Sequence, residues 1–171
     1  MLKFLNKKKN DNKGFSLVEL IIVVAILAIL VGLLAPQYLK YVEKSRKSAD
    51  ASNLDEMVRA IQVYAADAEV TLPEDTYTIE IGKNGTTVTP NKEANKTTAE
   101  TALSETAPDW KKTKLKSNKW SNGETDDAKK ANVESISAII KVEQDGGTTV
   151  TYTPSTLADY INKTAGKTAT K

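Results

Sequence analysis

One apolar stretch near the N-terminus limits what this chain can fold into more than any other feature. From Leu20 to Leu39 the sequence contains no charged residue and is dense in Leu, Ile and Val. As a helix, these twenty residues would reach about 30 Å, which is the thickness of the hydrocarbon core of a bilayer. A helix that is apolar on every side must be buried in lipid or among other helices, so the stretch predicts a membrane-length helix. The polar remainder is long enough for one modest globular domain.

The charge of the chain is divided unevenly. Residues 1–14 contain five lysines and one aspartate, a net charge of +4, whereas the whole chain carries +2 and the remainder therefore −2. Under the positive-inside rule the basic head stays in the cytoplasm and the globular domain lies outside the membrane. The head does not indicate nucleic-acid binding.

The composition also limits the chemistry. The chain contains no Cys and no His. This excludes disulfides, thiolate and imidazole metal ligands, and catalytic triads that use either residue. No motif of paired acids stands out. We therefore expect no enzyme activity, no cofactor and no metal.

A single carboxylate, Glu19, interrupts the apolar residues four positions after Phe15, which itself follows Gly14. A secretory signal has a shorter apolar run that a small-residue cleavage site follows, and neither property fits here. Taken alone, the run predicts an uncleaved membrane anchor. An acid inside the membrane needs a partner, and a cleaved chain would offer the new amine of Phe15 in a neighbouring subunit. The alternative is that Glu19 reaches back to the membrane surface.

Residues 13–36, KGFSLVELIIVVAILAILVGLLAP, resemble the N-terminal signature of type IV prepilins, and the helical pattern continues more loosely to about Ala68. The resemblance implies that a prepilin peptidase cuts after Gly14 and methylates the amine of Phe15. It also implies that Glu19, the fifth mature residue, guides assembly of subunits. The lack of Cys and the Lys/Asn/Thr-rich composition suggest a likeness to the major pilins of Gram-positive bacteria such as clostridia.

The far end of the apolar helix contains two helix breakers, Gly32 and Pro36. Because proline removes a backbone hydrogen bond and clashes with the preceding turn, we expect a kink there. The resemblance implies that the helix partly unwinds at this place in a filament.

Residues 37–70 predict an amphipathic helix on which the globular domain packs, ended before Pro73. Its apolar residues recur mostly at steps of three, four or seven: Leu39, Val42, Ala49, Leu54, Met57, Ile61, Tyr64, Ala65 and Ala68. The charged residues are expected on the other face: Lys40, Glu43, Lys44, Arg46, Lys47, Asp50, Asp55, Glu56 and Arg59.

The outer part of the chain predicts two β-hairpins. Residues 76–81 alternate like a half-buried strand, Asn84-Gly85 forms a turn, and residues 86–89 return. Residues 136–142 form the clearest strand, which a turn at Asp145-Gly146-Gly147 joins to residues 148–152. Two short helices complete the domain, a surface helix around Ala99, Ala102 and Leu103, and a last helix over 156–163 that Ser155 caps and that buries Leu157, Tyr160 and Ile161. The fold class is α+β, a long N-terminal helix packed against an antiparallel sheet in a pilin-like roll.

One segment interleaves two tryptophans with five lysines, which is a pattern that can bind single-stranded nucleic acid by stacking and charge. The alternative is a solvated loop whose tryptophans pack on the sheet, with Glu124, Asp126 and Asp127 damping its positive field. A further alternative is that Asp126 and Asp127 belong to a calcium site, because this cation binds several oxygen ligands. The candidate partner-binding residues are Trp110, Lys111, Lys112, Lys114, Lys116, Lys119 and Trp120.

These observations predict four regions: a leader over 1–14 that is removed, an apolar transmembrane and filament-core helix over 15–36, an amphipathic spine over 37–70, and a β-rich outer domain over 71–171. The resemblance implies a type IV pilus subunit that serves adhesion, twitching motility and biofilm formation. Its expected partners are further copies in a helical filament, the prepilin peptidase, an assembly ATPase with its membrane platform, the membrane before assembly, and a surface or DNA ligand. We expect it first in the cytoplasmic membrane and then in an extracellular pilus. The alternatives are a pseudopilin of a type II secretion or competence system, and a single-pass anchored binding module that never polymerises.

Overall fold

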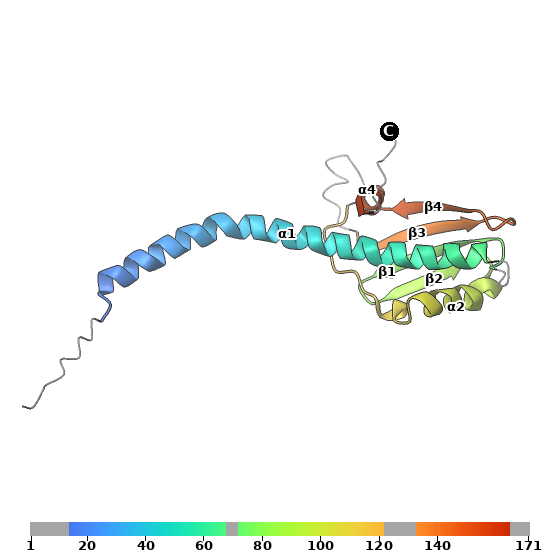
Figure 1. Ribbon diagram of the computed structural model, residues 1–171, viewed down its shortest axis with the longest axis horizontal. Helices are drawn as coiled ribbons and strands as arrows, with labels where there is room; N and C mark the ends of the chain where they lie inside the picture. The colour runs from blue at the N-terminus through green and yellow to red at the C-terminus, as the bar shows by residue number, and fades with distance from the viewer. Residues whose placement is uncertain (1–13, 68–71, 122–132, 165–171) are drawn as a thin grey trace, which may run out of the picture. The chain divides into compact units, whose positions relative to one another are not determined.

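The computed structural model describes residues 14–67, 72–121 and 133–164. The chain divides into two compact units, Met1–Lys40 and Tyr41–Lys171, and each is described by itself. The elements in chain order are α1 (Leu17–Ala66), β1 (Asp75–Gly82), β2 (Thr86–Pro90), the 3-10 turn η1 (Glu93–Asn95), α2 (Lys96–Thr106), the 3-10 turn η2 (Trp110–Lys112), β3 (Ser135–Val142), β4 (Thr148–Thr153) and α4 (Ser155–Thr164) (Figure 1).

The described part of the first unit consists of the start of α1 and the three residues before it. α1 is long and apolar enough to cross a membrane, and its most apolar window buries no residue inside the protein. The helix is continuous through Gly32 and Pro36, and the kink expected there stays a prediction. Pro36 removes one hydrogen-bond donor, and the intact turns on both sides keep the remaining helical hydrogen bonds. Partial unwinding in a filament stays a prediction.

The second unit is built on a four-stranded antiparallel sheet of order β2-β1-β3-β4. The two predicted hairpins are confirmed, and β1 pairs with β3 in the middle, with Ile79 opposite Ala138. Gly85, with φ +150°, makes the first turn possible, and its carbonyl accepts the N–H of Gly82 at 2.9 Å. The predicted burial of alternate residues fits this sheet, because residues two apart lie on one face of a strand.

One face of the sheet packs on residues 41–66 of α1, and the core lies between them. From the sheet it takes Tyr77, Ile79, Ile81, Val88, Ile136, Ala138, Ile140 and Val142. The helix contributes Leu54, Met57 and Ile61 as predicted, together with Ala51, Val58 and Ala60. α2 lies beside β2 and α4 beside β4, closing the two edges of this layer (Figure 1).

The two short helices occur where the sequence predicted them, with small differences. Ala99, Ala102 and Leu103 of α2 are buried in the core, as are Leu157 and Ile161 of α4, whereas Tyr160 is half-buried. α4 begins at Ser155 itself, one residue earlier than expected, which is within the usual uncertainty of helix ends.

The predicted spine reaches beyond the described end of α1. The described helix ends at Ala66, and the predicted extension of the spine to residue 70 falls mostly outside the described residues and stays a prediction. The turn between β3 and β4 meets the helix here: a Cβ on Gly146, whose φ is +82°, would lie 2.7 Å from the carbonyl oxygen of Ala65. This close approach requires glycine and marks the end of α1 in space. Pro73 set only a limit beyond which the helix could not continue.

Candidate functional site

The predicted cleavage site lies just ahead of α1. Gly14, Phe15 and Ser16 are not helical, and Phe15 is 86% exposed. Nothing lies within 4 Å of the position that a side chain on Gly14 would occupy. The peptide bond between Gly14 and Phe15 is therefore open and outside the helix, which is the arrangement that a peptidase needs in its substrate.

Glu19 takes part in the N-terminal cap of α1. The N–H of Ser16 donates to Glu19 Oε2 at 3.0 Å, and the N–H of Val18 donates to the hydroxyl of Ser16 at 3.3 Å. The carbonyl of Ser16 accepts the N–H of Leu20 at 3.1 Å. This is a capping-box arrangement, in which an acid three residues after the cap returns to the cap's own N–H. The sequence analysis missed it, although Ser-x-x-Glu before an apolar run was the available signal.

The capping box places the carboxylate of Glu19 within one residue of Phe15. A cut after Gly14 would create an amine at that level of the helix. One Glu19 oxygen is held by Ser16, and the other oxygen remains able to accept a further donor. The arrangement can thus bind a cation beside the cleavage site without rebuilding the helix.

The rest of this unit is an apolar surface. Every residue from 14 to 40 is exposed, including Leu27 and Leu33. Exposed apolar patches of this size mark a membrane or protein contact. The described residues provide no internal cover for this part of α1.

In the segment from Trp110 to Trp120, the two tryptophans are not exposed as binding of nucleic acid would require. Trp110 is 2% exposed and Trp120 is 0% exposed. Indoles buried in the core cannot stack on bases, so their burial argues against stacking and agrees with the alternative in which the tryptophans pack inside the domain. The ring of Trp120 makes an edge contact with Tyr160, at 5.2 Å between centroids.

The lysines of the segment remain at the surface. Lys111 and Lys112 form ion pairs with Glu100 and Asp109, at 2.7 and 2.8 Å. The other three, Lys114, Lys116 and Lys119, are exposed. The candidate site therefore keeps its charge and loses its aromatic surfaces.

Asp50 holds this segment to α1, and the sequence analysis placed it wrongly on the polar face. It is 0% exposed. Its carboxylate accepts the backbone N–H groups of Lys116 and Ser117, each at 2.9 Å, and the indole Nε1–H of Trp120 at 3.2 Å. Three donors satisfy a buried charge that would otherwise be costly. No local signal could have shown this, because the donors lie 66 to 70 residues further along the chain.

Two neighbours complete this clasp, which we define as Glu43, Lys47 and Asp50 on α1 with residues 116–120. The hydroxyl of Ser117 donates to Glu43 Oε1. The ammonium of Lys47 lies 5.0 Å from the centroid of the Trp120 ring, within the range of a cation–π contact. Burial lowers the pKa of Lys47; Glu43 opposes this shift and Lys119 adds to it.

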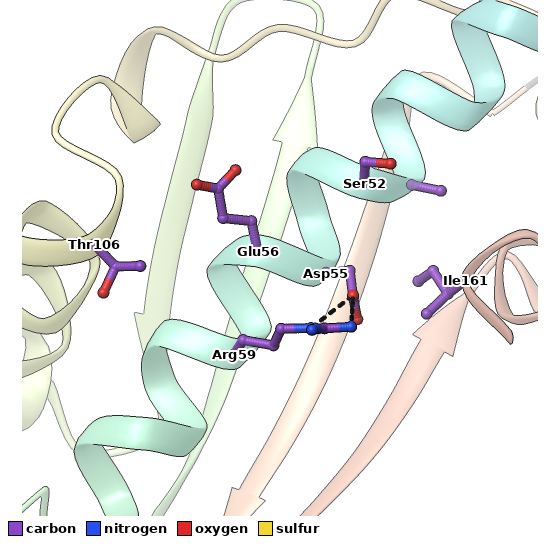
Figure 2. A pocket seen from close by; sticks show the side chains of 7 residues that line it. Ser52, Asp55, Glu56, Arg59, Thr106 and Ile161 are labelled. Atoms are coloured by element: carbon purple, nitrogen blue, oxygen red, sulfur yellow. Dashed lines mark hydrogen bonds and ion pairs between the residues drawn. The ribbon is translucent and has the colours of Figure 1, made fainter. Parts of the chain in front are cut away.

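A shallow groove crosses the outer side of α1 between the end of α2 and α4 (Figure 2). Glu56 points toward the side of Thr106, while Arg59 lies with Asp55 toward Ile161, in an ion pair of 2.9 Å. Ala51 and Ser52 complete the lining. The groove offers a surface for contact whose charged residues are Asp55, Glu56 and Arg59.

Metal chemistry has little support in the residues described. Within 14–67, 72–121 and 133–164, no three His, Cys, Asp or Glu side chains gather closely enough to hold a metal ion. Glu124, Asp126 and Asp127 lie outside the described residues, so the calcium hypothesis stays untested.

Comparison with known proteins agrees with the N-terminal geometry. A family model described as the prokaryotic N-terminal methylation motif matches residues 9–35. Three curated relatives, each a type IV major fimbrial protein FimA from Dichelobacter nodosus, are 41% identical over 61 residues, which is 36% of this chain. The chain spans about two fifths of the length of these relatives, 38 to 39%. No solved structure is significantly similar to this chain.

The long N-terminal helix, the antiparallel sheet packed on it and the methylation motif at its start define a helix-anchored protein of pilin-like α+β fold. The motif and the fimbrial relatives support a finer assignment, because the N-terminal part of the chain is similar to that of type IV pilins.

Proposed function

We propose that the chain is the structural subunit of a type IV pilus and polymerises into a surface filament. One observation carries this proposal: α1 exposes its whole apolar N-terminal part, most of which lies within the methylation motif matched over residues 9–35. Lipid can cover this surface before assembly, and other copies of the same helix can cover it afterwards. Since lipid tails and neighbouring helices are about equally apolar, the exchange costs little and can be reversed.

Processing precedes assembly in this proposal. The prepilin peptidase removes residues 1–14 and methylates the Phe15 amine, working on the open peptide at Gly14. Residues 15–36 then serve as membrane anchor and later as filament core, with residues 37–70 as the spine of the outer part, 71–171. The exposed position of Gly14 and Phe15 ahead of the helix supports this order.

Glu19 supplies the register between subunits. The amine of an incoming subunit's Phe15 approaches Glu19 of a neighbour, and opposite charges attract strongly where water is excluded. The capping box supports this role because it holds the carboxylate at the level of the amine. An assembly ATPase and its membrane platform move the subunit from membrane to filament, which then serves adhesion, twitching motility and biofilm formation.

Gly14→Ile tests the proposal in cells that express the full chain. A branched side chain in place of Gly14 should block cleavage, leave the protein in the membrane and abolish its labelling in surface filaments. Wild-type chain should appear along long filaments by immunogold microscopy. Short filaments alone would instead favour a pseudopilin, and wild-type chain that stays in the membrane with its leader intact would favour the anchored module.

A further inference from the structure

One end of the globular unit is basic. We define the basic face as Lys44, Lys116 and Lys119, which are all exposed. The clasp holds residues 116–120 along α1 beside Glu43 and Asp50, so these lysines lie where α1 enters the unit. The ion pairs recorded for the described residues include none of the three.

The opposite end of the unit is acidic. We define the acidic face as Glu74, Glu143 and Asp145, which line a cleft beside the last turn of α1. Glu74 and Asp145 are exposed, and Glu143 is half-buried. Lys141 lies 2.6 Å from Glu143 and neutralises one of the three charges, so the face keeps an excess of negative charge.

The two faces are too far apart to neutralise each other within one subunit. Lys44 and Ala66 are both on α1, and the 22 residues between their positions correspond to about 33 Å of helix. Exposed charges are screened within about 8 Å at physiological salt. The two faces therefore do not neutralise each other within one subunit, and each is open to a partner from outside it.

We propose that the basic face of one subunit docks against the acidic face of a second copy, so that globular units meet end to end along the filament. This contact rests on the proposed function and adds the identity of two surfaces that touch. A contact between two different faces does not close on itself, so it continues from copy to copy. Complementary charge at both faces fixes direction and register while adding little to the affinity.

Anionic lipid headgroups are the rival occupant of the basic face. The apolar stretch ends at Leu39, a few residues before Lys44, and lysines next to a membrane segment attract such lipids. Binding of anionic lipid would account for the basic face alone. Contact with a second copy accounts for both the basic and the acidic face, and this favours self-association.

Charge reversal in the full chain tests the contact. Lys116→Glu with Lys119→Glu should lower the fraction of chain recovered in sheared filaments roughly tenfold, and Glu74→Lys with Asp145→Lys should do the same. All four changes together should restore that fraction to within about twofold of wild type, because the interface is then only inverted.

Two controls accompany the reversals. Glu56→Lys with Glu80→Lys makes the same change in net charge as the acidic-face variant, on exposed residues that belong to neither face, and should leave the filament fraction unchanged. Thermal unfolding of each purified variant, followed by circular dichroism, should show a folded globular unit, with a small loss of stability for the acidic-face variant because Asp145 also accepts the N–H of Gly147 at 2.9 Å.

The outcomes separate the rival explanations. Loss with the lysine variant alone, and no rescue by the fourfold variant, would overturn the contact in favour of lipid. Normal assembly of both reversals while wild type forms filaments would overturn the contact and leave the pilus subunit intact. Absence of wild-type chain from every filament would overturn the proposed function and this contact with it.

Discussion

The two halves of α1 differ in whether the chain buries their apolar side chains. Residues 17–40 expose all their apolar side chains, whereas residues 41–66 bury Leu54, Met57 and Ile61 against the sheet of the same chain. The second half therefore gains its burial from the fold of its own chain, and the first half depends on lipid or on other subunits for burial. Substitutions in the first half should change recovery of the chain in filaments, and substitutions in the second half should change the free energy of unfolding.

Glu19→Ala should give the largest effect and confine it to assembly. The change leaves the Phe15 amine of the neighbouring subunit without its counter-charge, and an unpaired charge among apolar helices costs about 2.5–3.5 kcal/mol, which corresponds to about a hundredfold loss of chain in filaments. Quantitative immunoblots of sheared filaments measure this loss. Urea unfolding of the same variant should match wild type, because Glu19 lies outside the globular unit. Unchanged filament yield would mean that the carboxylate has no role in assembly.

Leu54→Ala should have the opposite signature. Leu54 is 0% exposed in the core, so removing its side chain should lower the free energy of unfolding by about 2–5 kcal/mol. Val63→Ala is the matched control on the same helix, because Val63 is 69% exposed and should change stability by less than about 0.5 kcal/mol. Urea denaturation followed by circular dichroism measures both. Equal losses at the two positions would contradict the assignment of the core.

Asp50→Ala should destabilise the clasp. It removes the acceptor of three hydrogen bonds and leaves the N–H groups of Lys116, Ser117 and Trp120 unsatisfied, at about 1–3 kcal/mol for each buried donor without a partner. Water entering the site reduces the total, so we expect a loss of about 2–4 kcal/mol in urea denaturation. Trp120 fluorescence should shift to the red as the indole is exposed. Glu56→Ala, which changes an exposed acid on the same helix, provides the control. An equal loss of unfolding free energy for both variants would contradict the role of Asp50 in the clasp.

Acid should weaken the globular unit through Asp75. Burial raises the pKa of this carboxyl, but hydrogen bonds from the N–H of Lys92, the amide of Asn95 and the N–H of Thr76 outweigh it and lower the pKa below 3.8. A lowered folded-state pKa stabilises the fold above the unfolded value, and this contribution is lost as the pH falls through the folded-state pKa. Urea midpoints should therefore fall below about pH 4 in wild type and fall less in Asp75→Asn. If the urea midpoints of the two proteins fell equally with pH, Asp75 would be excluded as a source of the acid sensitivity.

Local patterns in the sequence predicted most of the elements. Asn84-Gly85 and Asp145-Gly146-Gly147 located both turns, and alternation located β1 and β3 with the correct faces. These features depend on residues close together in the chain, so a single sequence contains the information.

Long-range contacts account for what the sequence could not predict. Asp50 has the charge of a surface residue, and only donors about seventy residues away make it a core residue. The last turn of α1 lies against the turn at Gly146, which is far along the chain from it. At the N-terminus the residues Gly14, Phe15 and Glu19 were predicted from resemblance, while the cap formed by Ser16 was not predicted and is shown by the structure.

The mass and N-terminal sequence of the chain in sheared surface filaments would test the pilus proposal before anything else. A chain that begins at Phe15, carries one additional methyl group and dominates the preparation is the result we predict. It would establish the cut after Gly14 and the major-subunit role together. A chain that keeps residues 1–14 and occurs only in membranes would contradict the proposal and leave a membrane-anchored module.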